Sequence, residues 1–201
     1  MTLTKTTHGV LLALMFTSGI ALAPAQEVAL PVDPPANAVN PVVGGAAPDR
    51  TASAVESLAR SSDHKRLVEA LEAAGLTGAI NAPNPLTVFA PTDAAFSSST
   101  YMSFSDLMRE ENKGKLAELL RYHIVAGSFD TATLDARIDA GGGRAVLTTV
   151  QGANLVVQRS ADQYTITDAT NHTARITVAN VYQRNGIVQV VDQVLMPTTT
   201  P

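Results

Sequence analysis

Residues 86–96 read Leu-Thr-Val-Phe-Ala-Pro-Thr-Asp-Ala-Ala-Phe and contain the strongest structural signal in the chain. The first four are apolar or β-branched, which is typical of a buried strand. Pro91 has no N–H to donate, so pairing with a neighbouring strand should stop after Ala90. We therefore predict a strand that ends at the proline, with Val88 facing one side of the sheet and Phe89 the other.

A polar pair, Thr92 and Asp93, follows the proline directly. The side-chain oxygen of Thr or Asp can accept a hydrogen bond from the first N–H groups of a helix, which otherwise lack partners. The pair therefore predicts a helix start rather than a catalytic corner. Phe96 should return the chain to the core, and Asp93→Ala should cost about 0.5–2 kcal/mol as a lost cap.

Apolar spacing indicates helices before this stretch and strands after the middle of the chain. A short helical stripe begins at Ala54, and a second helix runs from an expected N-cap at Asp63 to Gly75. Short β-branched runs fill the second half, separated by turns such as Gln151-Gly152. The expected strands cover 146–150, 155–158, 164–167, 176–181 and 187–191. Helices first and strands later favour an α+β fold over a βαβ repeat.

Composition excludes several classes of function. The formal net charge is −4, so the chain has no basic surplus with which to bind nucleic acid. It has no cysteine, and its four histidines do not show metal-ligand spacing. Phosphate-binding glycine motifs are absent from the sequence as well. We expect no metal and no cofactor.

The N-terminal region indicates export. Lys5, an apolar run and a series of small residues are typical of a secretory signal peptide, assigned to residues 1–25. Residues 26–50 are rich in Pro and Ala, which predicts a spacer. The folded domain is assigned to 51–197 and a short tail to 198–201, with no transmembrane segment once the signal is cleaved. The expected location is the periplasm, the cell surface or the medium.

Nucleophilic catalysis receives little support. A hydrolase would have to pair the serines at 97–99 with His123, yet the chain has no Gly-x-Ser-x-Gly elbow and no evident acid to orient the histidine. A polar loop is the ordinary explanation of such a serine run. We predict that the protein is not an enzyme.

Three motifs, in order along 51–197, resemble those of the fasciclin-type domain. The first box is the stretch at 86–96, the central motif is Leu-Leu-Arg-Tyr-His-Ile-Val-Ala-Gly at 119–127, and the closing box is Asn-Gly-Ile-Val-Gln-Val-Val-Asp-Gln-Val-Leu-Met-Pro at 185–197. The residues assigned to structural roles in the two boxes are Thr87, Phe89, Pro91, Thr92, Asp93, Phe96, Asn185, Gly186, Asp192 and Pro197.

The resemblance implies a β-sandwich or wedge of short, mainly antiparallel strands with helices packed on it. It also implies an adhesion module that binds a protein or glycan of the cell surface or matrix without catalysis. Because single weak contacts adhere poorly, weak homo-association or dense presentation is expected. The alternative is a carrier that holds a small lipid-like or aromatic ligand between the sheet and its helices.

The family's adhesion-associated pair falls on Tyr122 and His123. These residues lie where an amphipathic helix meets an apolar strand, so the sequence favours packing with a local hydrogen bond over direct contact with a partner. One position departs from the family pattern, because Gln189 stands where the closing box usually carries a histidine. Glutamine keeps the hydrogen-bonding capacity but does not titrate near neutral pH.

Overall fold

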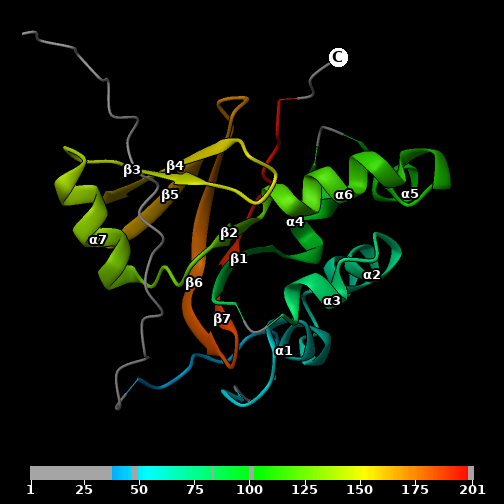
Figure 1. Ribbon diagram of the computed structural model, residues 1–201, viewed down its shortest axis with the longest axis horizontal. Coiled ribbons are helices and arrows are strands. Elements are labelled where there is room, and N and C mark those ends of the chain that lie inside the picture. Colours follow the sequence, from blue (N-terminus) through cyan, green and yellow to red (C-terminus); the bar gives the residue numbers. More distant parts are fainter. Residues whose placement is uncertain (1–37, 47–48, 83, 100–101, 199–201) are drawn as a thin grey trace, which may run out of the picture.

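The structure, a computed structural model, describes residues 38–46, 49–82, 84–99 and 102–198 (Figure 1). The predicted signal peptide and residues 26–37 of the predicted spacer lie outside these residues, as do residues 199–201 of the tail. In the described part, the helices are α1 (Ala54–Arg60), α2 (Lys65–Ala73), α3 (Thr77–Ile80), α4 (Asp93–Ser98), α5 (Phe104–Leu107), the 3₁₀ turn η1 (Glu110–Asn112), α6 (Lys113–Tyr122) and α7 (Thr131–Ala140). The strands are β1 (Leu86–Pro91), β2 (Ile124–Ala126), β3 (Ala145–Thr148), β4 (Asn154–Ser160), β5 (Gln163–Thr167), β6 (Thr173–Gln183) and β7 (Gly186–Val191).

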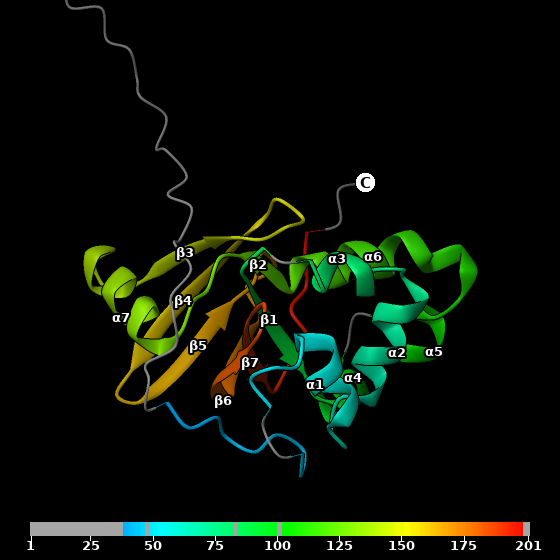
Figure 2. The ribbon, with the colours of Figure 1, turned by 60° about the horizontal axis from the view of Figure 1, so that its bottom comes forward.

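The α+β class is confirmed. The described helices all precede residue 141, and five of the seven strands follow it. Helices α1 to α6 gather on one side of the sheet, while α7 lies on the opposite side (Figures 1 and 2). The five strands expected after the middle of the chain are all present, within a few residues of their predicted bounds.

The strands form one sheet in the order β2-β1-β7-β6-β5-β4-β3. Neighbouring strands are antiparallel except for β1 and β7, which pair in parallel from Leu86 opposite Gly186 to Pro91 opposite Val191. The first and closing sequence boxes thus lie side by side, as the second and third strands of the sheet.

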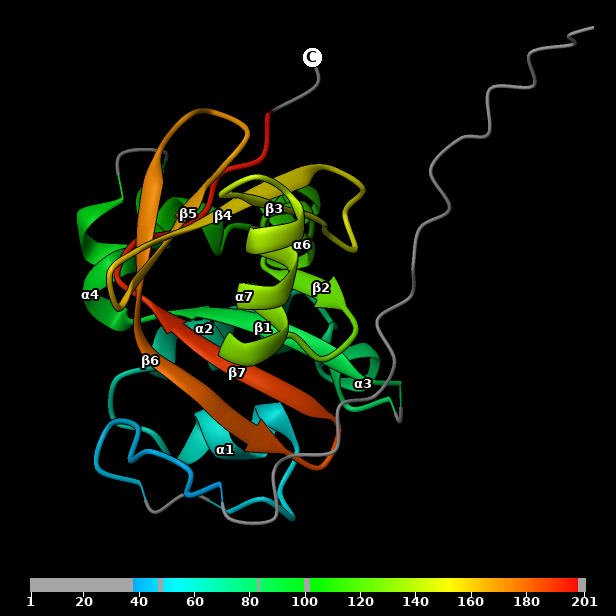
Figure 3. The ribbon, with the colours of Figure 1, turned by 90° about the vertical axis from the view of Figure 1, so that its left-hand side faces the viewer.

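The sheet bends along β6, which gives the predicted wedge. The first part of β6 pairs with β5, and most of the strand pairs with β7, with register shifts between Ile176 and Val181. Within this irregular part, Asn180 has a φ of 60°, a left-handed conformation that Asn tolerates better than most residues. The two edge strands consequently approach each other: Val125 pairs with Thr149, and the Val150 N–H donates to the Ile124 carbonyl at 2.7 Å. Figure 3 shows α7 facing the viewer in front of the sheet.

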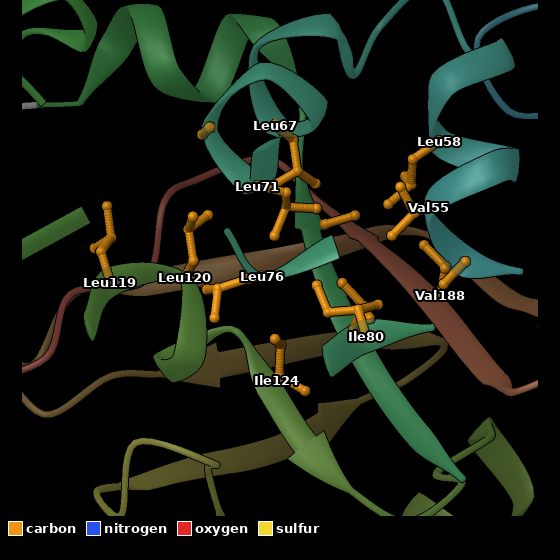
Figure 4. Packing of buried hydrophobic residues seen from close by; sticks show 14 of the residues in the cluster. Val55, Leu58, Leu67, Leu71, Leu76, Ile80, Leu119, Leu120, Ile124 and Val188 are labelled. Atoms are coloured by element: carbon orange, nitrogen blue, oxygen red, sulfur yellow. The ribbon is translucent and has the colours of Figure 1, made fainter. Parts of the chain in front are cut away.

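Two apolar clusters stabilise the two sides of β1. One joins helices α1 to α6 to the sheet and includes Val88, and Figure 4 shows its leucines, isoleucines and valines close to β1. The other lies inside the bent sheet beneath α7 and includes Phe89. Every residue of β1 is buried. The prediction that Val88 and Phe89 face opposite sides is therefore confirmed.

The polar corner after β1 connects two helices rather than capping only one. Thr92 is the N-cap of α4, and its hydroxyl accepts from the Ala95 N–H at 3.2 Å. The Asp93 carboxylate instead accepts from the Arg66 N–H in the first turn of α2, at 2.9 Å. Asp63 was expected to cap α2, but His64 occupies that N-cap position without a side-chain bond. The expectation for Asp63 was wrong because the Asp93 carboxylate, which lies 27 residues after Arg66 in the sequence, accepts the hydrogen bond from the first turn of α2.

The end of the predicted spacer packs against the domain. Asn40 is buried, and its side chain exchanges two hydrogen bonds with the backbone of Tyr182, at 2.7 and 2.9 Å. Gly44 accepts a bond from the Ser62 N–H at 3.1 Å. The boundary at residue 50 stays a prediction, but residues 38–46 are attached to the sheet and to the segment before α2.

Candidate functional site

The closing box begins with a side chain that joins three segments. The Asn185 oxygen accepts from the Ala54 N–H at the start of α1, at 3.1 Å, and its amide group donates to the Ile80 carbonyl at the end of α3. Its own carbonyl accepts from the Leu86 N–H at 3.2 Å. The buried Asn185 therefore fixes two helices against the first residue of β1.

Gly186 allows β1 and β7 to approach. It has a φ of 147°, and a Cβ at this position would lie 1.9 Å from the Leu86 carbonyl oxygen. No other residue fits there without moving the backbone. The conformation explains why the motif needs Asn-Gly at the point where the two boxes meet.

Tyr122 of the central motif is fully buried and connects α6 to the far half of the sheet. Its hydroxyl donates to the Asn154 carbonyl at 3.0 Å and accepts from the Ala169 N–H at 2.8 Å. Burial, together with the negative charge of Asp168, raises the pKa of Tyr122 to about 12. The phenol is therefore a neutral structural hydrogen-bonding group.

His123 is buried as well, and both ring nitrogens bond to the backbone. Nε2 accepts from the Leu195 N–H at 2.9 Å, so Nδ1 must carry the proton that is donated to the Leu119 carbonyl at 2.8 Å. Burial lowers the pKa of His123 to about 4, while the Leu119 bond and Asp168 act in the opposite direction. The neutral ring joins the end of α6 to the closing box.

The remaining motif residues hold the segments next to the sheet. The Thr87 hydroxyl donates to the Gly127 carbonyl and accepts from the Phe129 N–H, both at 2.8 Å. The Asp192 carboxylate accepts from the Arg175 N–H at 2.7 Å, while Pro197 is buried near the end of the described chain. Together these bonds fix the approach to α7 and the exit from β7.

At Gln189, where the family pattern has histidine, both the nitrogen and the oxygen of the side-chain amide form hydrogen bonds. Its nitrogen donates to the Phe129 carbonyl at 2.8 Å, and its oxygen accepts from the Asn180 N–H at 3.0 Å. Asn180 in turn bonds through its side chain to the backbone and hydroxyl of Thr131, at 2.9 and 2.7 Å. Sequence reasoning missed Asn180, although an Asn inside a β-branched run is a signal for a bulge.

The structure thus brings the sequence-predicted residues together in one internal network around β1 and β7. Neither Tyr122 nor His123 reaches the surface, with 0% and 2% of the residue exposed. An adhesion role for the pair stays a prediction, and this arrangement favours packing over direct contact. His123 is also unavailable as a base for the serine run, because both of its ring nitrogens are engaged by the backbone. Among the described residues, no cluster of His, Asp or Glu could hold a metal ion.

The described surface has hollows on either side of the seam between β2 and β3. A largely apolar pocket of about 220 Å³ lies between α3, the end of α6 and β2, with Arg121 and Val150 among its lining residues. A more open groove of about 390 Å³ lies between α7 and β3 and includes Arg137 and Arg144. Neither hollow was predicted. The apolar pocket is formed by segments far apart in the sequence, whereas the groove is formed by residues 136–146, around the turn between α7 and β3.

The sequence profile of the Fasciclin domain matches residues 62–197. The chain belongs to the fasciclin domain family. This match includes all three motifs, and the network above shows that they meet in the interior. The residues matched begin near α2, so α1 and the packed part of the spacer precede the region of the match.

Relatives occur in bacteria and animals. The chain is 32% identical to Protein sll1483 of Synechocystis over 157 residues, which cover 78% of this chain and 79% of that protein. It is 32% identical to the immunogenic protein MPB70 of Mycobacterium bovis, over 55% of this chain and 49% of the relative. Human periostin is 27% identical over 73% of this chain, but only 16% of periostin is covered.

Among solved structures, the chain is similar to a pair of FAS1 domains from the insect cell adhesion molecule Fasciclin I. The TM-score is 0.57 with 16% identity, and the match covers 72% of this chain and 51% of the other. At this identity the likeness shows the fold alone, which is the fold that the resemblance implied. In the described residues, no helix is long and apolar enough to cross a bilayer.

Proposed function

We propose that the chain is an exported adhesion module that binds a protein or glycan of a cell surface or matrix without catalysis. The observation that carries the proposal is the family match over 62–197, together with a fold similar to that of a cell adhesion molecule. The internal network supports it indirectly. The polar residues Asn185 and His123 of the motifs form hydrogen bonds with the backbone that hold α1, α6 and the closing box together.

Bead adhesion tests the proposal. Beads coated with residues 26–201 should adhere to the producing cells above blank beads, and deletion of the gene should reduce adhesion of the cells themselves. Dense coating should adhere better than sparse coating at equal total protein, because many weak contacts act together. Adhesion equal to that of blank beads, with no defect in the deletion strain, would overturn the proposal.

A variant of the buried Tyr122–His123 pair, measured in the same assay, tests whether the pair contacts a partner. Tyr122→Phe removes one hydroxyl from the interior and should lower stability, since the Ala169 N–H and the Asn154 carbonyl lose a partner. If the pair only packs, bead adhesion should fall no further than the folded fraction does. A loss of adhesion with unchanged melting would instead assign Tyr122 to the partner contact.

Export is part of the proposal and has its own measurement. N-terminal sequencing of the native protein should find cleavage after Ala23 or Ala25, where small residues have the expected spacing. Fractionation would then assign the mature chain to the periplasm, the surface or the medium. A native protein that retains Met1 and remains in the cytoplasm would overturn this part.

The alternative function, carriage of a small lipid-like or aromatic ligand, gains one specific observation. The apolar pocket beside β2 provides a place for such a ligand. Native mass spectrometry of protein purified from its source tests carriage directly. A clean apo mass in every preparation would count against it.

A further inference from the structure

The pocket beside β2 opens from the main apolar cluster to the surface. Its inner wall is formed by Leu76, Ile80, Leu86 and Ile124, all of which are buried members of that cluster. Figure 4 shows Leu76, Ile80 and Ile124 near one another beside β1. The wall is therefore buried and apolar, as expected of a preformed ligand site rather than a surface irregularity.

The rim of the pocket differs from its wall. Val150 lies at the rim with 54% of the residue exposed, and the hydrogen bond from its N–H to the Ile124 carbonyl fixes its backbone beside β2. Arg121, in the last turn of α6, supplies the one charged side chain among the lining residues. Within the described residues, no ion pair engages the Arg121 guanidinium. An arginine remains protonated at any physiological pH.

The volume limits the size of an occupant. About 220 Å³ is below the roughly 300–1,000 Å³ of sites for drug-sized ligands. An apolar cavity of about 150 Å³ takes up benzene, so simple scaling leaves room for about nine carbon atoms. The single rim cation selects among small apolar molecules, because a carboxylate can form two parallel hydrogen bonds with a guanidinium.

We propose that this pocket binds a small amphiphilic carboxylate, an arylalkyl or alkyl acid whose apolar part enters the pocket and whose carboxylate meets Arg121. The inference deepens the carrier function and rests on that alternative rather than on adhesion. It assigns Arg121 to recognition of the head group and the residues of the α3–β2 wall to the apolar part.

The test uses 3-phenylpropionate, a nine-carbon acid, titrated into the isotope-labelled chain and followed by NMR. The amides of Ala126 and Val150 at the rim should shift and saturate. Phenylacetate, shorter by one methylene, should bind about fourfold more weakly, the equivalent of about 0.8 kcal/mol. The neutral 3-phenylpropan-1-ol should bind about threefold more weakly than the acid, since an exposed ion pair contributes only modestly.

Two variants separate the wall from the rim. Ala126→Phe fills the pocket from an exposed position on β2 and should reduce binding of every probe more than tenfold, whereas Ala140→Phe, exposed on α7, should not. Arg121→Gln should abolish the difference between acid and alcohol, and Lys115→Gln on the same helix should preserve it. Amide spectra and melting curves of each variant establish that it is folded.

Three results would overturn the inference. They are the absence of saturable shifts at 10 mM 3-phenylpropionate, undiminished binding by folded Ala126→Phe, and an acid–alcohol difference that survives Arg121→Gln. Bead adhesion with Ala126→Phe keeps the two functions apart. Adhesion that persists in this variant while ligand binding is lost shows that the adhesion proposal stands independently of the pocket.

Discussion

His123 should make the stability of the domain depend on pH between about 6.5 and 4. Its pKa is lowered to about 4 in the folded chain, whereas an unfolded histidine titrates near 6.5. Between pH 6.5 and 4 the unfolded chain binds a proton at His123 and the folded chain does not. The contribution of His123 to the unfolding free energy is therefore fully present above pH 6.5 and is lost as the pH falls toward 4. The full shift corresponds to about 3 kcal/mol of unfolding free energy, most of which should be lost by pH 4.5.

The structural reason is specific to the two bonds of the ring. Protonation of Nε2 would replace an acceptor by a donor opposite the Leu195 N–H, so that bond would be lost in addition to the cost of a buried charge. His123→Gln removes the titration while retaining an acceptor that can reach Leu195. At pH 7.5 the variant should be less stable, because a flexible amide replaces a fixed ring.

Urea unfolding of both chains from pH 7.5 to 4.5 measures the effect. Carboxylates and the other histidines titrate in both chains, so the difference between the two unfolding free energies isolates His123. That difference should narrow by about 2–3 kcal/mol, which at usual urea slopes is a change of roughly 1–2 M in the separation of the two unfolding midpoints. A constant difference across the range would refute the assignment of a neutral, doubly bonded ring.

Three further changes test the interior network. Asp93→Ala should lower the unfolding free energy by about 0.5–2 kcal/mol, because the hydrogen bond to the Arg66 N–H is lost. Asp63→Ala should lower it by less than about 0.5 kcal/mol. Equal losses in chemical denaturation would contradict the assignment of Asp93, rather than Asp63, to the start of α2. Gly186→Ala should cost at least about 2–3 kcal/mol, because its Cβ meets the Leu86 carbonyl, while Gly114→Ala on α6, with open space around it, should be neutral or stabilising in thermal melts. Gln189→His places a titratable ring at a fully buried position, so the variant should lose stability relative to the parent as the pH falls below about 6.5; parallel stability curves would show that position 189 can accommodate the charge.

Local signals account for much of the architecture. The strand that stops at Pro91, the Thr92 cap of α4 and the turn at Gln151-Gly152 each depend on residues within a few positions of one another. Propensity, missing donors and backbone conformation act over that range, so the sequence predicts them without knowledge of the partner segments. The order of helices and strands, and hence the α+β class, follows from the same signals.

The contacts that position the candidate sites could not be predicted in this way. Asp93 was expected to cap its own helix, yet Thr92 caps α4 and the Asp93 carboxylate bonds to α2, which the tertiary fold brings beside it. Tyr122 and His123 were expected to pack with a local hydrogen bond, but only the approach of β4 and the closing box determines that both side chains are enclosed. Hydrophobic periodicity shows that a face is buried but not which distant segment covers it.

The sequence by itself determined the two boxes, the central Tyr-His motif and the family to which they point. Tertiary structure alone decided that the boxes pair in parallel, that the edge strands β2 and β3 meet, and that a pocket rimmed by Arg121 lies beside that seam. The physical reason is the distance along the chain over which each feature is encoded. A cap or a turn is formed by neighbouring residues, whereas a strand pair or a pocket exists only after segments many residues apart have packed together.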